Sequence, residues 1–164
     1  SKIVYTFTHP HGSITCVGVG RGFGWVVTGD SEGVAVLWRL AKGAERGLLG
    51  KAATTIYTAL STPSLSDSEY TPYRTFRGLH NSPLTTVELS KDLKTILTCD
   101  AQGRIGLHDI VTTTVLSRID LPGPAQNVTL GDGGELGCYC QTTRTLRIFD
   151  TSCTERGEEG EEEA

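Results

Sequence analysis

Residues 26–38 read Val26-Val27-Thr28-Gly29-Asp30-Ser31-Glu32-Gly33-Val34-Ala35-Val36-Leu37-Trp38, and residues 96–108 match them without gaps as Ile96-Leu97-Thr98-Cys99-Asp100-Ala101-Gln102-Gly103-Arg104-Ile105-Gly106-Leu107-His108. A weaker third copy runs from Cys138 to Asp150. Each unit of such a repeat must bury its apolar face against the next, so the repeat predicts stacked units. Three units are few for a repeat array of this kind, and we expect the chain to be part of a larger repeat structure.

The units contain short β-branched runs between Gly, Asp and Ser turns, with a period of about forty residues, which indicates antiparallel sheet. The expected strands are 14–19, 25–28, 34–38 and 73–76 in the first unit, 84–89, 95–98, 104–108 and 115–119 in the second, and 127–130, 136–140 and 145–149 in the third. Residues 3–7 are typical of a fourth strand from a preceding unit. The sequence shows no long helical periodicity, so we predict an all-β chain.

This pattern resembles the WD-repeat β-propeller family. In that family a His precedes the first strand, a Ser or Thr lies in the second, an acid lies in the turn, and Trp-Asp ends the third. The matching residues are His11, Thr28, Glu32 and Trp38 in the first unit, His80, Thr98, Gln102 and His108-Asp109 in the second, and Phe149-Asp150 in the third. The departures from the family pattern leave open whether any blade forms the full hydrogen-bond network.

The resemblance covers about residues 3–150, apart from an insertion, and implies part of a WD-type propeller. The expected blades are four-stranded antiparallel sheets at about 9–77, 78–119 and 120–152, with the third incomplete. His80 lies 18 residues before Thr98, as the family spacing requires. We therefore expect His80 to hydrogen-bond toward Thr98, and His11 toward Thr28.

Two segments break the repeat. Residues 40–72 form an insertion, of which 53–60 could add a strand, and a loop of this length is either functional or disordered. Its possible phosphorylation sites are Thr62, Ser66, Ser68 and Thr71. The insertion is read either as a regulatory or docking loop or as a neutral insertion. Residues 153–164 are rich in Glu and Gly, and we expect a disordered acidic tail.

One motif suggests catalysis. Residues 29–33 match Gly-x-Ser-x-Gly, the nucleophile elbow of hydrolases, which would make Ser31 the nucleophile. That elbow needs a helix after the Ser, whereas a β run follows here, and the second unit carries Ala101 in the same slot. We therefore interpret the motif as a structural turn and expect no enzyme activity, with a serine hydrolase as the alternative.

Metal and nucleic-acid sites are also disfavoured. Cys138-x-Cys140 has no second ligand pair nearby, so we expect two packed thiols. The four histidines occupy repeat-related places, and we predict no metal and no cofactor. The net charge is −4 and there is no basic stripe with interleaved aromatic residues, which disfavours nucleic acid as a partner.

The cellular setting follows from composition. Five scattered cysteines are typical of a reducing compartment, and we expect the cytoplasm. No apolar run approaches eighteen residues, so no membrane insertion is expected. The chain begins with Ser1, which suggests that the true N-terminus is missing.

The function implied by the resemblance is a non-catalytic platform or scaffold for protein–protein interaction, within a fragment of a larger multi-domain propeller protein. Its partners are proteins, and the open blade faces would pair with the rest of the chain or with another copy. One alternative is the C-terminal propeller of a BEACH-type membrane-trafficking protein; another is a purely structural subunit. The sequence leaves open the partner, the number of blades and the oligomeric state.

Overall fold

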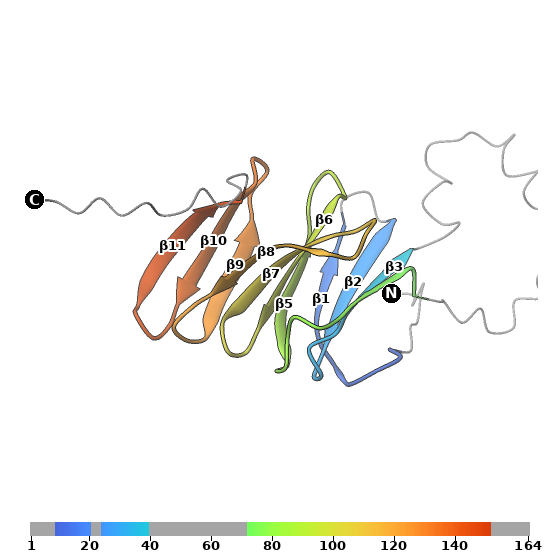
Figure 1. The fold of residues 1–164 in the computed structure, drawn as a ribbon, viewed down its shortest axis with the longest axis horizontal. Helices are drawn as coiled ribbons and strands as arrows, with labels where there is room; N and C mark the ends of the chain where they lie inside the picture. The colour runs from blue at the N-terminus through green and yellow to red at the C-terminus, as the bar shows by residue number, and fades with distance from the viewer. Residues whose placement is uncertain (1–8, 21–23, 40–71, 152–164) are drawn as a thin grey trace, which may run out of the picture.

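The computed structural model describes residues 9–20, 24–39 and 72–151, which form three antiparallel sheets (Figure 1). The first sheet contains β1 (Ile14–Val19), β2 (Trp25–Asp30), β3 (Ala35–Arg39) and β4 (Arg74–Phe76). The second contains β5 (Leu84–Leu89), β6 (Thr95–Asp100), β7 (Arg104–Asp109) and β8 (Val115–Asp120). The third contains β9 (Ala125–Leu130), β10 (Glu135–Cys140) and β11 (Thr145–Asp150).

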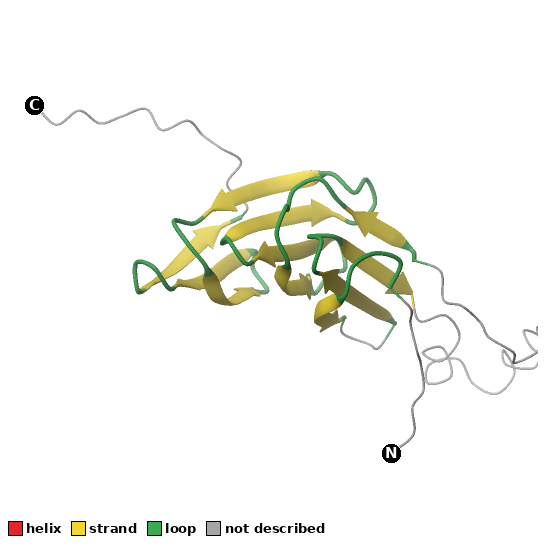
Figure 2. Cartoon of the chain, turned by 90° about the horizontal axis from the view of Figure 1, so that it is seen from below, coloured by secondary structure: helices red, strands yellow, loops and turns green. Residues whose placement is uncertain are grey.

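Within each sheet the strands pair in chain order, so every sheet is a meander. Figure 2 shows strands joined by short turns, and the described ranges contain no helix, hence none that could cross a membrane. The predicted all-β fold is confirmed, including the three strands of the last sheet. The expected strands at 3–7 and 53–60, the rest of the insertion up to residue 71, and residues 152–164 lie outside the described residues.

Several strands end later than the sequence pattern predicts. β2 and β6 both continue to an aspartate, because Asp30 still pairs with Ile14 and Asp100 with Leu84. β3 begins at Ala35, one residue later than expected, and the Val34 amide instead donates to the Asp30 carboxylate at 2.8 Å. These ends matter because they place both aspartates inside the sheets.

A bulge recurs where the first two strands of each sheet pair. The register shifts between Ile14 and Cys16 in the first sheet, and between Leu84 and Thr86 in the second. The extra residue is Thr15 or Thr85, whose hydroxyl donates to a carbonyl of the next strand at 3.2 Å in both sheets. The third sheet also has a shift, but one residue further along its second strand, between Gly137 and Tyr139. Equivalent bulges are a second sign of the repeat, since bulges mark a defined geometry.

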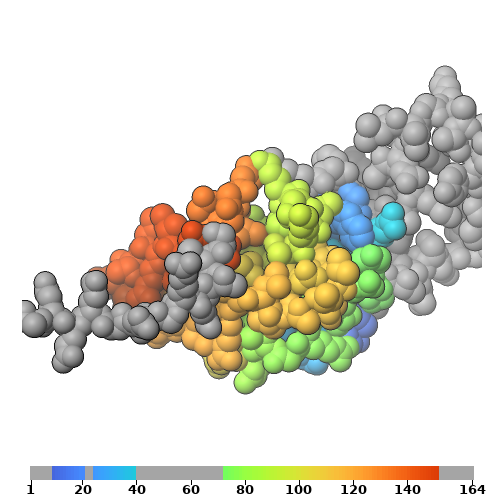
Figure 3. Space-filling model, turned by 45° about the horizontal axis from the view of Figure 1, so that its top comes forward, coloured from blue at the N-terminus to red at the C-terminus, as the bar shows by residue number. Residues whose placement is uncertain are grey.

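The core lies between the sheets. The second sheet is sandwiched between the first and the third, and Figure 3 shows the three as one continuous body with β11 near one end. The core between the first two sheets consists of Val27, Ala35, Leu37, Phe76, Leu84, Val87, Ile96 and Ile110. The core between the last two consists of Leu97, Cys99, Ile105, Leu107, Leu121, Ala125, Val128, Leu136, Cys138 and Cys140.

Candidate functional site

The second sheet contains a buried chain of hydrogen bonds that joins the loop before β5 to strands β6 and β7. His80 Nδ1 lies 2.9 Å from Asp100 Oδ2, and His80 Nε2 lies 2.7 Å from Thr98 Oγ1. The same hydroxyl lies 2.9 Å from His108 Nε2. The predicted bond between His80 and Thr98 is confirmed. All four side chains belong to buried residues.

The geometry fixes where the protons lie. Asp100 can only accept, so His80 donates from Nδ1 and its Nε2 must accept the Thr98 hydroxyl proton. Thr98 then accepts from His108, which carries its proton on Nε2. His108 Nδ1 is left as a buried acceptor with no partner. Both imidazoles are therefore neutral in this arrangement.

Burial lowers the pKa of both rings. The pKa of His108 falls from 6.5 to about 4, first because of burial and second because of repulsion from His80. Burial also lowers the pKa of His80, although the hydrogen bond to Asp100 opposes this effect. The His108 ring packs edge to face against Phe76 of the first sheet, with ring centres 5.5 Å apart, so an apolar side chain covers it on that side.

The first sheet holds a related but incomplete network. Trp38 Nε1 donates to Thr28 Oγ1 at 2.8 Å, as His108 does to Thr98. The registers agree, because Trp38 pairs with Val26 and His108 with Ile96, so the predicted equivalence of Trp38 and His108 is confirmed. The histidine that faces Asp30 is His9. Its Nδ1 lies 3.5 Å from Asp30 Oδ2, which is longer than the 2.9 Å between His80 and Asp100.

The expected bond from His11 to Thr28 is wrong. His11 instead contacts the Arg77 guanidinium at the surface. His9 takes the inner position, since its ring lies 6.2 Å from Trp38 and its side chain is almost fully buried. His9 Nε2 has no hydrogen-bond partner, which leaves this network one bond short of the second sheet's.

The acids of the two networks are Asp30 and Asp100, two residues before the predicted Glu32 and Gln102. Asp30 Oδ1 accepts the amides of Glu32 and Val34 at 2.9 and 2.8 Å. Asp100 Oδ1 accepts the amides of Gln102 and Arg104, both at 3.0 Å. Glu32 and Gln102 point outward from the turns and supply only backbone donors.

The third sheet replaces the three members of the network that lie on strands. The strand registers place Cys138 at the position of Thr98, Cys140 at that of Asp100, and Phe149 at that of His108. Both thiols are fully buried in the core against the second sheet. The Cys-x-Cys motif therefore takes the place of the Thr-x-Asp pair. Cys138 packs in the core, whereas the Cys140 thiol is hydrogen-bonded to Thr143, which lowers its pKa.

Ser31 lies in the turn between β2 and β3. Its hydroxyl accepts the Ser13 amide at 3.1 Å, and its own amide donates to the Ser13 carbonyl at 2.9 Å. A strand follows the turn, whereas a nucleophile elbow needs a helix there. The two hydrogen bonds between Ser31 and Ser13 attach the loop before β1 to this turn.

The remaining predicted positions separate into turn and end residues. Asp109 ends β7 and accepts the amides of Val111 and Thr112 at 2.8 and 2.7 Å, and these bonds hold its pKa below the usual range. Phe149 is half-buried against the core and Asp150 ends β11. Thr62, Ser66, Ser68 and Thr71 lie outside the described residues. No group of three or more potential metal ligands exists in the described ranges.

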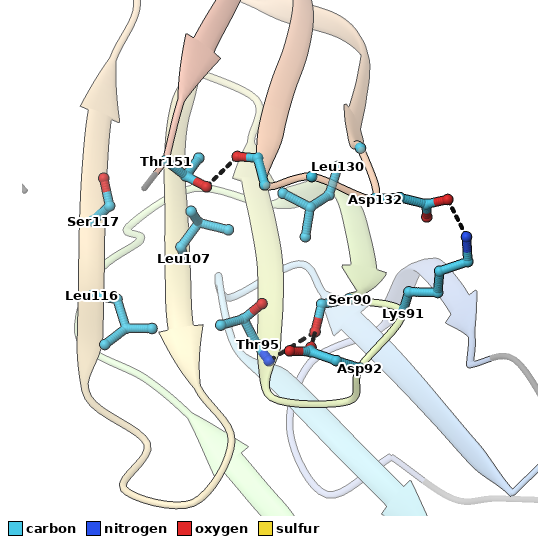
Figure 4. Close-up of a pocket in the computed structure, with 13 residues that line it drawn as sticks. Ser90, Lys91, Asp92, Thr95, Leu107, Leu116, Ser117, Leu130, Asp132 and Thr151 are labelled. Carbon is cyan, nitrogen blue, oxygen red and sulfur yellow. Dashed lines mark hydrogen bonds and ion pairs between the residues drawn. The ribbon is translucent and has the colours of Figure 1, made fainter. Parts of the chain in front are cut away.

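A groove of about 540 Å³ opens between the second and third sheets (Figure 4). Leu107, Leu116 and Leu130 form its apolar part, and the turns 90–94 and 131–134 form its rim. Lys91 of one turn is ion-paired with Asp132 of the other, and the Leu130 amide donates to Glu88 at 3.1 Å. These two contacts add to the buried core that joins the third sheet to the second.

The outward faces of the two end sheets carry exposed apolar side chains. In the third sheet, Leu146 and Ile148 are 72% and 71% exposed. They pair with Tyr139 and Gly137, which alternate with the core residues of β10 and so face away from the second sheet. In the first sheet, Val17 and Val19 lie on the corresponding outward face, at 62% and 61% exposed.

Comparison with known proteins supports the fold. No protein-family model matches the chain, and no curated protein matches it in sequence. Among solved structures, it is similar to the β-propeller domain of Cps50 (Swd1) from Myceliophteria thermophila, with a TM-score of 0.64 and 17% sequence identity. The match covers 90% of this chain and 38% of that one, so the chain spans well under half of the matched structure. The fold is that of part of a β-propeller.

Proposed function

We propose that the chain is a non-catalytic platform for protein–protein interaction, and that its outward end faces are binding surfaces for further propeller-type sheets, either from a longer chain or from a second copy. The observation that carries this proposal is the pair Leu146 and Ile148, which are exposed on the outward face of β11. In the described part of the chain, β11 also has no strand on its outer edge. Propellers close radially and so protect such faces and edges.

The internal site supports the same proposal. Its polar side chains form hydrogen bonds between the strands and the preceding loop, within a buried network. Such a network holds the loops of one end in fixed positions, which suits a surface that binds other proteins. Cys16, Cys99, Cys138 and Cys140 are free thiols, which supports our further proposal of a reducing compartment such as the cytoplasm.

The test replaces both exposed side chains of β11 with lysine. We expect the wild-type chain to self-associate as its concentration rises, and Leu146→Lys/Ile148→Lys to remain at the monomer mass in sedimentation velocity. Val111→Lys is the matched control, because Val111 is 76% exposed but lies in the turn after β7. Equal association of wild type and double variant would overturn the role of this face.

A further inference from the structure

A bulge in β8 shapes the groove between the second and third sheets. Two successive residues of β7 pair with Val115 and Ser117, so Leu116 between them is an extra residue without a partner. In a regular strand Leu116 and Ser117 would lie on opposite faces, whereas here both line the groove. Leu116 is 56% exposed and is not one of the core residues that join these sheets. A bulge can re-aim a side chain, and this one turns an exposed leucine toward the groove.

The groove has an apolar part large enough for a side chain of another molecule. Leu107 is buried at its base, and Leu130 is half-buried at the end of β9 (Figure 4). The neighbouring turn 131–134 contains three glycines, so Asp132 is its only residue with a side chain. The volume of about 540 Å³ lies within the range of pockets that bind ligands.

The surroundings of the groove are acidic. Carboxylates outnumber lysines in the turns and at the strand ends on this side of the described second and third sheets: Asp92, Asp109, Asp132, Glu135 and Asp150 against Lys91 and Lys94. Asp92 Oδ1 accepts the Ser90 hydroxyl at 2.7 Å and the Lys94 amide at 3.1 Å. Within the described ranges, the other oxygen of Asp92 is contacted only by the Lys94 ammonium, 3.8 Å away. This oxygen is open to a cation of a bound molecule.

The outer edge of β8 offers backbone groups beside the groove. In the described sheets, no strand pairs with this edge. The Leu121 amide donates to the Gly103 carbonyl, so in the alternating pattern of an antiparallel pair the backbone groups of Arg118 point away from β7. An exposed edge of this kind pairs with an extended peptide.

We propose that the groove is a docking site for an extended segment of a partner protein, with an aliphatic side chain between Leu116 and Leu130 and a nearby arginine or lysine at Asp92. The excess of carboxylates favours a basic segment, because charge complementarity selects the partner. The edge of β8 favours an extended backbone. This site is separate from the outward end faces, so it goes beyond the platform function proposed above and does not depend on whether those faces are covered.

The experiment uses the full 164-residue chain, labelled with ¹⁵N, and the peptide acetyl-Thr-Leu-Thr-Arg-Thr-amide as the probe. Leucine and arginine are two residues apart in the probe, so they lie on one face of an extended backbone. We expect the probe to shift the amide signals of Leu116 and of the turn 131–134, with a Kd of about 1 mM or lower. A probe with serine in place of leucine should bind at least about fivefold more weakly.

Two variants test the two parts of the groove. Leu116→Ser should weaken binding about fivefold, and Asp92→Asn about two- to threefold. Both should fold, because Leu116 is exposed and asparagine still accepts the Ser90 hydroxyl; the ¹⁵N spectra verify this. Leu146→Ser and Glu32→Gln are the matched controls, an exposed leucine and an exposed acid at other places, and should bind like the unchanged chain.

The outcomes are distinct. Shifts in the groove that need both the leucine of the probe and Leu116 support the proposal. Equal shifts with the serine probe overturn it, because charge alone would then attract the peptide. No shift at about 5 mM probe also overturns it. Shifts confined to Leu146 and Ile148 overturn it as well, but they support the outward face as a binding surface, so the two proposals can fail separately.

Discussion

His108 occupies the position that Trp38 holds in the first sheet, but with a ring that can be protonated. In both sheets a ring N–H donates to the threonine of the neighbouring strand. An indole has no further polar atom, whereas His108 keeps an unpartnered Nδ1 in a buried site. Protonation of this atom would place a charge beside Phe76 and near His80. The substitution of His for Trp thus preserves the hydrogen bond and adds a sensitivity to acid.

The first prediction concerns stability between pH 7.5 and 4. Because the pKa of His108 is lowered to about 4 in the folded state and is about 6.5 in the unfolded chain, the unfolded state binds more protons in this range. The contribution is therefore complete above pH 6.5 and is lost as the pH falls toward 4, by roughly 3 kcal/mol. The lowered pKa of His80 acts in the same direction. Urea unfolding at several pH values measures this loss.

Two variants separate the network from other groups. His108→Gln keeps a neutral N–H donor, and we expect it to reduce the loss of stability between pH 6.5 and 4, while the lowered pKa values of His80 and His9 keep part of it. Gln102→Ala, at an exposed position of the same sheet with no titratable group, is the control and should leave the profile unchanged. Asp109 and Asp120 have lowered pKa values, so their contributions are lost only below about pH 3.9. A profile for His108→Gln that equals the wild type would contradict the assignment.

The sequence predicts the second network better than the first for a simple reason. An ungapped alignment of the repeats places Pro10 opposite His80, so His9 and His11 are equally close to the expected position. Only the packing of His9 against Trp38 decides between them. The acids could have been found, because Asp30 and Asp100 are identical in both copies whereas Glu32 and Gln102 differ. The family spacing favoured the wrong position in the turn.

At the level of elements, the turn between the second and third strands depends on glycine. Gly33 and Gly103 have φ values of +82° and +88°, in the left-handed region. A Cβ at Gly103 would overlap the Gly123 carbonyl oxygen in the loop before β9. This close approach brings the backbone of the turn before β7 against the loop before β9, and the Leu121 amide donates to the Gly103 carbonyl at 3.1 Å.

The second prediction compares two glycines with nearly equal φ. Gly78 has a φ of +85° but open space around its Cβ position. Gly78→Ala should therefore cost only the left-handed strain, about 1–2 kcal/mol. Gly103→Ala should cost at least about 1 kcal/mol more, because a backbone carbonyl must also move. The midpoints of thermal or urea unfolding measure the difference. Equal losses of stability in the two variants would show that the loop before β9 can move away from the added methyl group at little cost.

The strands themselves follow from the sequence, since alternation and turn residues predict each of them to within two residues. The bulges do not, because Thr15 and Thr85 look like ordinary β-branched strand residues. Their role appears only when their hydroxyls reach the carbonyls of the neighbouring strand, and Thr15 also donates to the Leu84 carbonyl of the second sheet at 2.6 Å. A contact between sheets cannot be derived from the period of a single strand.

At the level of the whole molecule, the three sheets have unequal surroundings. The second sheet is covered on both faces, by the first sheet through Phe76 and Leu37 and by the third through Leu136. The third sheet is covered on one face, and β11 has no partner on its outer edge in the described ranges. In stacked repeats, stability depends on contacts with the nearest neighbours, so the end units are the weakest. The sequence predicted the stacking and the missing fourth strand of the third sheet, but not that Leu146 and Ile148 would be exposed on its outward face.

The third prediction follows from this inequality. In hydrogen exchange at pH 7, amides of β6 and β7 should exchange at least about tenfold more slowly than those of β11, because local opening of the end strand breaks fewer contacts. Leu146→Lys/Ile148→Lys, measured at the same dilute concentration, should leave this order unchanged. If β11 of the wild type were as protected as β6 and lost that protection in the double variant, its outward face would already be covered in solution. Comparing the two proteins thus distinguishes the intrinsic weakness of the end sheet from the effect of a bound neighbour.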